Sequence, residues 1–416
     1  MLYFLSLLLI DNFLSVDVGT EYFKIAKATY SGNPEIVQFP GVGGSIPAAI
    51  AFKSSEPING PLTNETLEDV EVRYHKQAVS ILKRNSSLGY QFIPRLIGRQ
   101  NTTTFNTSNL VTPFEALCLT LSNALSTVKI SDAVTFIVPH YWTQEQKLVL
   151  HQFCKVYNIP LKLVIDDCDV IGMQYSALRG KRFENATDLP SGYNVLFIDI
   201  GGTTTKVFEL SFYMEKDMAA ASESIYFWDE NIGGYWFRKA LSESLNISMK
   251  KAEKMLKRES DIEKVVKNMP KVVNRLYSMI ASTTKYAHEM AEIRRVRRVD
   301  EVQIIGGAST YPFIMDLVKK ATNMTNVRHE FHPIETTAIA GVLASMQMSS
   351  ESRYLPTFIY KRPPANITLK CGEENQLCRR GFRCDRYVRE HDSRACDVAY
   401  LLMDNTSVPE GCSPVL

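Results

Sequence analysis

The stretch from residue 195 to residue 210 constrains the fold most, because it reads as two strands joined by a turn. Its first four residues and, apart from Glu209, its last four are apolar, and both runs have the length and composition of β-strands. Asp199 stands where the first run ends, and Gly201 and Gly202 supply the backbone freedom that a tight turn needs. The stretch therefore predicts a β-hairpin whose turn presents backbone N–H groups, hydroxyls and one carboxylate together.

The chemistry of that turn favours a phosphate site. Backbone amides and the hydroxyls of Thr203, Thr204 and Thr205 can surround phosphate oxygens, while Asp199 can hold a magnesium ion or orient a water molecule. Because short Gly-rich signatures often occur without a ligand, an ordinary tight hairpin rich in glycine and threonine is the alternative interpretation.

Residues 13–26 repeat this pattern near the start of the chain. An apolar run leads to Asp17, Gly19, Thr20 and Glu21 follow, and a second apolar run returns. Two such hairpins, each opening one half of the chain, could hold one triphosphate between them. The repetition makes a phosphate-binding role more specific than either hairpin does alone.

On these two hairpins the chain resembles the actin, Hsp70 and sugar-kinase ATPase superfamily, and within it the Hsp70 nucleotide-binding domain. The wording Asp-x-Gly-Thr-Glu-x-x-Lys-Ile-Ala at 17–26 is most similar to the large endoplasmic-reticulum Hsp70s of the Grp170, or hypoxia-upregulated, type. The resemblance covers roughly residues 13–349. It implies an α/β, two-lobed, ribonuclease-H-like ATPase fold that binds ATP or ADP together with magnesium.

The resemblance also assigns roles to individual residues. It implies that Asp17, Asp167 and Asp199 act in catalysis, and that Asp17 and Asp199 hold magnesium through water. Two later Gly-Gly pairs are similar to the family's turns at the phosphates and at adenosine, although the first would read the same as a simple loop. The implied nucleotide-binding residues are Gly19, Thr20, Glu21, Gly201, Gly202, Thr203, Thr204, Gly233, Gly234, Gly306, Gly307 and Ala308.

Three positions depart from the family pattern. Ala78 stands where the family has a catalytic lysine, Asp167 replaces a glutamate that is one methylene longer, and Thr310 replaces an arginine that stacks on the base. Loss of a positioned catalytic group typically lowers a rate by about 10²–10⁴, whereas loss of a base stack lowers only affinity. We therefore expect nucleotide binding with slow hydrolysis. A pseudo-ATPase without turnover is one alternative, and a small-molecule kinase, whose catalytic acid we cannot locate, is another.

At 416 residues the chain is too long for one compact domain, and we expect several segments. The interval between Gly234 and Gly306 is short for an Hsp70 and helical in pattern, which indicates a reduced outer subdomain. The segment after residue 364 is too short for the substrate-binding sandwich and helical lid of an Hsp70. The expected order is a signal segment at 1–12, lobe I at 13–190, lobe II at 191–349, a linker at 350–364 and a cysteine-rich tail at 365–416.

Charge and hydropathy limit the partners. The net charge of +2 argues against nucleic acid or an anionic membrane as the main partner. The apolar run at 2–10 is too short to span a bilayer and reads better as part of a signal peptide, so no membrane span is expected.

Sequons and cysteines indicate the secretory pathway. Five of the eight cysteines crowd the tail, which predicts a disulfide-stapled module in an oxidising compartment. The resemblance then implies a glycoprotein of the endoplasmic reticulum lumen that assists folding and stress responses, as a co-chaperone or regulator of another Hsp70 or of unfolded clients. The sequons, nine in all, are at Asn64, Asn85, Asn101, Asn106, Asn185, Asn246, Asn323, Asn366 and Asn405.

Overall fold

The computed structural model describes residues 12–29, 32–54, 70–97, 111–128, 133–216, 218–347 and 358–361. The chain divides into two compact units, each taken by itself below. Unit 1 comprises the chain up to Val170 together with Thr337–Ser352, and unit 2 begins with Ile171–Thr336. The expected signal segment lies outside the described residues except for residue 12, and the cysteine-rich tail lies wholly outside them.

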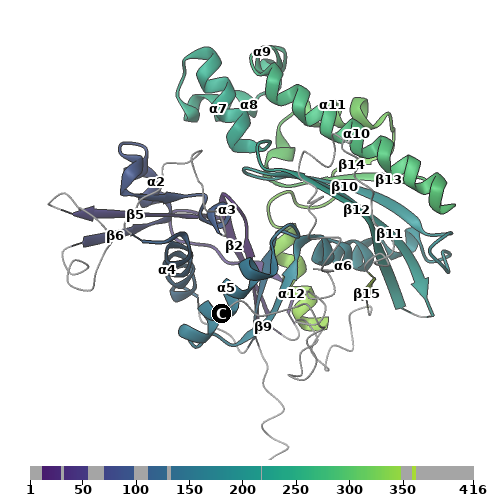
Figure 1. The fold of residues 1–416 in the computed structure, drawn as a ribbon, viewed down its shortest axis with the longest axis horizontal. Coiled ribbons are helices and arrows are strands. Elements are labelled where there is room, and N and C mark those ends of the chain that lie inside the picture. The colour runs from purple at the N-terminus through teal and green to yellow at the C-terminus, as the bar shows by residue number, and fades with distance from the viewer. Residues whose placement is uncertain are drawn as a thin grey trace, which may run out of the picture. The chain divides into compact units, whose positions relative to one another are not determined.

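Unit 1 contains two sheets and the helices that pack on them (Figure 1). The larger sheet has the order β3-β2-β1-β8-β9 with β4 paired to β2, and the smaller has the order β6-β5-β7. The strands are β1 (Asn12–Val18), β2 (Tyr22–Thr29), β3 (Glu35–Ile36), β4 (Ile46–Pro47), β5 (Ala49–Ser54), β6 (Val70–Tyr74), β7 (Gly89–Gln91), β8 (Ala133–Val138) and β9 (Leu161–Asp166). The helices are α2 (His75–Leu82), α3 (Ile93–Leu96), α4 (Pro113–Ser126) and α5 (Gln144–Val156).

The helix starts in unit 1 follow from their capping residues. Thr112 and Glu115 form a capping box at the start of α4, and Thr143 and Gln146 form another at the start of α5. β1 and β8 run parallel through the centre of the larger sheet, and every residue of β8 is buried.

The last long helix, α12 (Thr336–Gln347), returns the chain to unit 1. Ser345 donates a hydrogen bond from its hydroxyl to that of Thr135 in β8, at 2.6 Å. An ideal Cβ at Gly341 would lie 2.2 Å from a methyl carbon of Ile137, so the helix backbone packs directly on the strand. Unit 1 is therefore built from segments on both sides of the main segment of unit 2, 171–336.

Unit 2 is one sheet with the order β14-β13-β10-β11-β12-β15. Its strands are β10 (Tyr193–Ile200), β11 (Thr205–Glu215), β12 (Met218–Asp229), β13 (Glu301–Ile305), β14 (Val327–Arg328) and β15 (Phe358–Lys361). Its helices are α7 (Gly234–Leu245), α8 (Met249–Leu256), α9 (Ile262–Lys267), α10 (Pro270–Arg294) and α11 (Phe313–Thr322), and the 3-10 helices η2 (Gly180–Arg182), η3 (Glu259–Asp261) and η4 (Gly307–Thr310) connect them. β15 falls in the expected linker and pairs parallel to β12.

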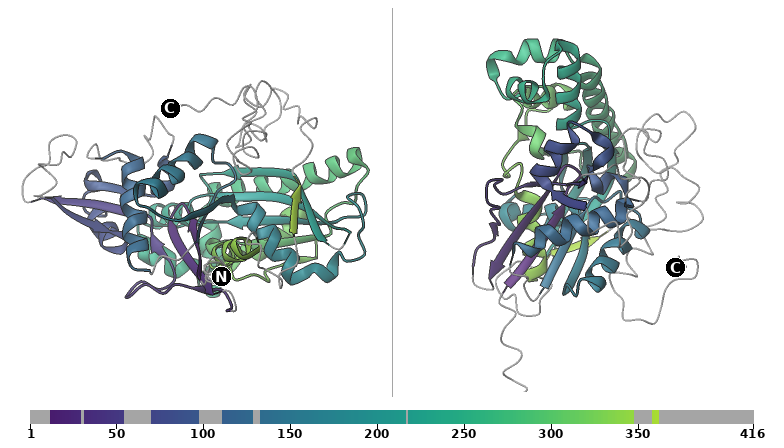
Figure 2. Two further views of the ribbon diagram at one scale, coloured as in Figure 1. Left: turned by 90° about the horizontal axis from the view of Figure 1, so that it is seen from below. Right: turned by 90° about the vertical axis from the view of Figure 1, so that its left-hand side faces the viewer.

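Helices cover both faces of the unit 2 sheet. Leu196 and Ile198 point to one face of β10, where they join a core with helices α7 to α11, coloured teal to green in Figures 1 and 2. Phe197 points to the opposite face, where Tyr175 of α6 (Asp167–Arg179) meets its ring edge-on at 5.6 Å. Between β12 and β13 the described chain is helical, as expected from the sequence.

The packing of α6 explains why the units divide earlier than expected. Tyr175 also lies 4.7 Å from the ring of Phe212 in β11, so the second half of α6 belongs to the unit 2 core. The sequence placed this boundary at 190, just before the strand β10, because the apolar contacts of α6 leave no mark in a linear pattern. The structure places it at Val170, inside the helix.

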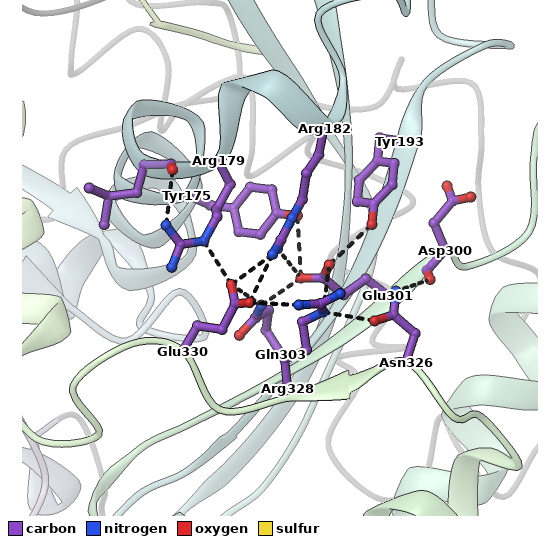
Figure 3. A network of polar contacts seen from close by, with 11 residues as sticks. Tyr175, Arg179, Arg182, Tyr193, Asp300, Glu301, Gln303, Asn326, Arg328 and Glu330 are labelled. Atoms are coloured by element: carbon purple, nitrogen blue, oxygen red, sulfur yellow. Dashed lines mark hydrogen bonds and ion pairs between the residues drawn. The ribbon is translucent and has the colours of Figure 1, made fainter.

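A partly buried ionic network connects the end of α6 and η2 to β13 and to the segment after β14 (Figure 3). Arg182 donates to Glu301 at 2.7 Å and to Glu330 at 2.8 Å, and Arg179 donates to Glu330 at 2.7 Å. Tyr193 donates a further hydrogen bond to Glu301, at 3.1 Å. Partial burial raises the pKa of Glu330, but the hydrogen bonds from Arg182 and Arg179 outweigh it and hold that pKa at about 2.

No helix among the described residues is both long enough and apolar enough to cross a membrane.

Candidate functional site

The turn between β10 and β11 is the first part of the candidate site in unit 2. Gly201 donates its N–H to the carbonyl of Thr204 at 2.9 Å, which closes the turn. The expected hairpin is confirmed, but neither Gly201 nor Gly202 has a positive φ. An ideal Cβ at Gly201 would lie 3.0 Å from the Thr204 carbonyl oxygen, so a side chain there would require the turn to shift slightly.

The Gly233-Gly234 segment at the start of α7 packs against this turn. Gly234 donates its N–H to the carbonyl of Gly201 at 3.0 Å, and Tyr235 donates to that of Gly202 at 2.7 Å. At Gly233, where φ is +157°, an ideal Cβ would lie 2.9 Å from both of those carbonyl oxygens. The turn and the helix start therefore form one backbone-lined assembly, and the first amides of α7 are used within it.

The third segment, Gly306 to Ala308, reaches the same place from β13. β13 runs parallel to β10, with Ile305 opposite Asp199, so both strands end at one edge of the sheet. At Gly306, φ is +89° and an ideal Cβ would lie 2.3 Å from an Asp199 carboxylate oxygen. Gly234 and Ala308 are also close, since an ideal Cβ on Gly234 would lie 3.4 Å from the Ala308 Cβ.

The threonines of the turn are buried and partly engaged. The Thr205 hydroxyl donates to the Ile232 carbonyl at 3.2 Å, and the hydroxyls of Thr203 and Thr204 lie 3.4 Å apart. The indole of Trp236 donates to the Thr203 carbonyl at 2.9 Å. The structure thus brings the three Gly-rich segments of unit 2 together, while the Thr205 hydroxyl serves to fix the turn.

Asp199 is paired with a lysine that the sequence interpretation did not single out. Lys206 lies directly opposite Asp199 in the antiparallel register, and its ammonium lies 2.6 Å from the carboxylate oxygen Oδ2. The two side chains are only 12% and 10% exposed. The missed signal is the spacing: Lys206 follows Asp199 by seven residues, the separation that a short hairpin turns into a direct pair.

Unit 1 repeats this pair in its own hairpin. Asp17 and Lys24 lie opposite each other in β1 and β2 and form an ion pair. Gly19 is required by space, since an ideal Cβ would lie 2.5 Å from the Tyr22 carbonyl oxygen. The carbonyl of Glu21 accepts the N–H of Ala48 at 2.9 Å, and Thr20 is buried beside it. Gly19, Thr20 and Glu21 thus form the turn expected of them.

Asp167, the expected catalytic acid, is buried at the start of α6. Its Oδ1 accepts the N–H of His140 at 3.2 Å and that of Cys168 at 2.9 Å. Its neighbour Asp166 pairs with the His140 ring at 2.8 Å and with Lys147 at 2.9 Å. Asp167 therefore holds the loop after β8 against α6, a positioning role for which its sequence neighbours gave no signal.

The other two departures from the family pattern differ in kind. Ala78 is fully buried and packs with Ala49, Ala51 and Leu82, so this position of α2 faces the protein core. Thr310 is exposed, and its hydroxyl donates to the Gly307 carbonyl at 2.9 Å. The first position has no room for a lysine, whereas the second could accept a longer side chain.

The Gly-rich edge and the two aspartates bear differently on a nucleotide and on a divalent cation. The side-chain positions of Gly201, Gly233 and Gly306 are filled by the protein's own atoms, which leaves a backbone-lined edge of the kind that phosphate can approach. A magnesium ion, in contrast, needs carboxylate oxygens and keeps several water molecules. Both expected metal ligands, Asp17 and Asp199, are instead neutralised by Lys24 and Lys206.

Comparison with known proteins gives two distant relatives. No family model matches the chain. The chain is 18% identical over 422 residues to Hypoxia up-regulated protein 1 of Danio rerio, a match that covers 83% of this chain and 41% of the relative. It is 19% identical over 423 residues to Hypoxia up-regulated protein 1 of Xenopus laevis, covering 83% of this chain and 62% of the relative.

The chain therefore spans less than two thirds of the length of these relatives. The similarity supports a distant relationship to the Hsp70 superfamily, and both relatives carry the name of the type that residues 17–26 resemble. The mixed α/β architecture of both units is compatible with an ATPase of that superfamily.

Proposed function

We propose that this chain is an Hsp70-like nucleotide-binding protein that takes ATP or ADP at the Gly-rich edge of unit 2. The observation that carries the proposal is the convergence of three segments, at Gly201, Gly233 and Gly306, on the ends of β10 and β13. Ligands of open α/β sheets bind at the carboxyl ends of their strands, and backbone-lined turns at such an edge are suited to phosphate.

The resemblance assigns the parts of the nucleotide within this edge. The turn at 201–204 and the Gly233-Gly234 pair would lie at the phosphates, and residues 306–308 would lie at adenosine. The dense backbone packing supports such a site because it fixes the turn before any ligand arrives, which lowers the entropy cost of binding.

Turnover is proposed to be slow or absent. The expected lysine position, Ala78, lies in the core of unit 1, and Asp167 is engaged by two backbone amides. Neither residue is arranged to handle a proton or a charged leaving group as the family's residues do. The burial of Ala78 favours a binding module over an active ATPase.

The cellular role proposed here is that of a chaperone regulator in the endoplasmic reticulum lumen. The relatives named Hypoxia up-regulated protein 1 and the nine sequons of the chain support this placement. Another Hsp70 or an unfolded client would be the protein partner. The chain would then signal its nucleotide state to that partner through its surface.

The proposal is tested by calorimetric titration of the purified protein with ATP and with ADP, followed by a measurement of phosphate release. We expect binding of both nucleotides and phosphate release well below that of an ordinary Hsp70. Gly307→Asp should weaken binding at least about tenfold, because it adds a negative charge where an ideal Cβ has its nearest neighbour at 3.9 Å.

Gly180→Asp is the matched control, since it makes the same change in unit 2 at a position with no atom within 4 Å of the ideal Cβ. It should bind nucleotide as the parent does. Absence of any nucleotide binding by the unmodified protein would refute the proposed function. Equal weakening by both variants would show that the Gly-rich edge is not the site.

A further inference from the structure

The ion pair between Asp199 and Lys206 supports an inference that goes beyond the proposed function. Its Oδ2 contacts the Lys206 ammonium at 2.6 Å, and its Oδ1 lies against Gly306, where an ideal Cβ would come within 2.3 Å. Oδ2 is thus paired with an ammonium, and Oδ1 packs against the backbone at Gly306. A hydrated divalent cation would have to displace a buried ammonium, and breaking one partner from a buried ion pair is strongly unfavourable.

The same arrangement occurs independently in unit 1. Lys24 pairs with Asp17 across the hairpin, and an ideal Cβ at Gly19 would lie 3.5 Å from the Lys24 nitrogen. The ammonium therefore sits over the turn that follows the aspartate. Two hairpins with different turns and different supporting helices have each placed a lysine on the aspartate that the sequence pattern assigns to magnesium.

We propose that Lys206 takes the place of the divalent cation at Asp199, so that this chain binds nucleotide without magnesium. The proposal rests on the proposed nucleotide site. An uncompensated carboxylate beside a phosphate repels it, and a bridging metal ion normally removes that repulsion. The Lys206 ammonium removes this repulsion as a fixed part of the protein, so the removal does not depend on the metal concentration.

The proposal predicts how charge at this pair controls binding. Lys206→Met leaves the Asp199 carboxylate uncompensated, so nucleotide affinity in the presence of a chelator should fall at least about tenfold. Magnesium should then restore it, because the vacated position can accept a cation. The double variant Lys206→Met with Asp199→Asn should recover binding in chelator without magnesium, since it has neither charge.

The experiment is a titration of the full chain with ATP, once in EDTA and once in millimolar magnesium. For the unmodified protein the two dissociation constants should agree within about twofold. A separate titration with Mn²⁺ alone, followed by its electron paramagnetic resonance signal, should show no tight site in the unmodified protein and one in Lys206→Met. Lys285→Met, an exposed lysine of α10 with 79% side-chain exposure, is the matched control and should behave as the parent in both measurements.

Each outcome is decisive. If the unmodified protein binds nucleotide only with magnesium, this inference is overturned and the proposed function stands. If it binds no nucleotide in either buffer, the proposed function itself fails. If Lys206→Met does not fold, the comparison of EDTA with magnesium and the Mn²⁺ titration on the unmodified protein still decide the question.

Discussion

The two hairpins of the molecule have the same strand pairing and differ in the segments that pack around their turns. In both, an aspartate pairs with a lysine seven residues later, across an antiparallel register. In unit 2 the turn between them is packed by two further Gly-rich segments, whereas in unit 1 the Glu21 carbonyl of the turn accepts a hydrogen bond from Ala48, beside the short strand β4. The ionic pair is therefore a property of the hairpin, and the backbone-lined edge is a property of its neighbours.

The largest effect is expected from Gly306→Val, which disturbs one of the Gly-rich segments packed on the unit 2 turn. A Cβ there would collide with Asp199 and with the Ile200 carbonyl, and φ is +89°, so we expect unit 2 to lose about 3–5 kcal/mol of unfolding free energy. Urea unfolding followed by tryptophan fluorescence measures this loss. Gly307→Ala, where the ideal Cβ has only Ile334 at 3.9 Å, should lose less than about 1 kcal/mol. Equal midpoints for the two variants would show that the contact at Gly306 is not needed.

In unit 1 the corresponding probe is Ala78→Lys, which restores the lysine of the family pattern. Because Ala78 is fully buried among Ala49, Ala51 and Leu82, the change should destabilise unit 1 by about 2–4 kcal/mol and should not raise phosphate release. Gln77→Lys, one position earlier and exposed, is the control and should change stability by less than about 0.5 kcal/mol. Faster phosphate release from Ala78→Lys would mean that α2 can present this residue to the nucleotide.

The second strands of the two hairpins, β2 and β11, differ in whether a charged side chain is buried three residues after the lysine. Lys27, three residues after Lys24, is exposed and pairs with Glu35, whereas Glu209, three residues after Lys206, is buried in the unit 2 sheet. Desolvation raises the pKa of Glu209 to about 8, although the Arg294 charge lowers it in part. The folded chain therefore holds a proton that the unfolded chain releases above its ordinary pKa of 4.5.

Stability supplied by this group is thus present at low pH and is lost as pH rises towards 8. Glu209→Gln should remove this slope and raise the unfolding free energy at pH 8 relative to the parent, on the order of 1–2 kcal/mol. Thermal unfolding from pH 5 to pH 8 measures the slope. Glu243→Gln, at a side chain with 68% exposure, should leave it unchanged. An unaltered slope in Glu209→Gln would assign the pH response to another group.

The smallest effect concerns only the edge of unit 2. Thr310 is exposed, so Thr310→Arg is accommodated, and a guanidinium stacked on adenine is worth about 1 kcal/mol. We expect ATP and ADP to bind about fivefold more tightly, as measured by calorimetry, while an isolated ribose triphosphate gains nothing. A similar gain for the ribose triphosphate would indicate simple charge attraction.

Local sequence patterns predicted the elements of the fold well. Both hairpins and the helical interval after Gly234 are present as expected. These features depend on residues close together in the chain, where periodicity and turn chemistry act directly. The motifs that carry the family resemblance are also short, so they too can be recognised from neighbouring residues.

What the sequence could not supply was contact between distant segments. Gly306 is required by Asp199 of another strand, and Ala78 is buried by β5, facts that no local pattern contains. The boundary inside α6 follows from the aromatic contacts of Tyr175. Lys24 and Lys206 can be read in the sequence, but only the register of the hairpins shows that each pairs with an aspartate.

The return of α12 to unit 1 sets the order in which a ribosome can complete the molecule. Ser345 and Gly341 pack on β8, so the sheet that is synthesised first keeps an uncovered face until the helix at 336–347 has emerged. Residues 171–336, the main segment of unit 2, are synthesised within that delay, and its edge strand β15 follows the helix. Because nascent domains otherwise fold from the N-terminus onward, unit 2 is expected to fold first here. During that interval the nascent chain itself presents the unfinished surface that a folding assistant would bind.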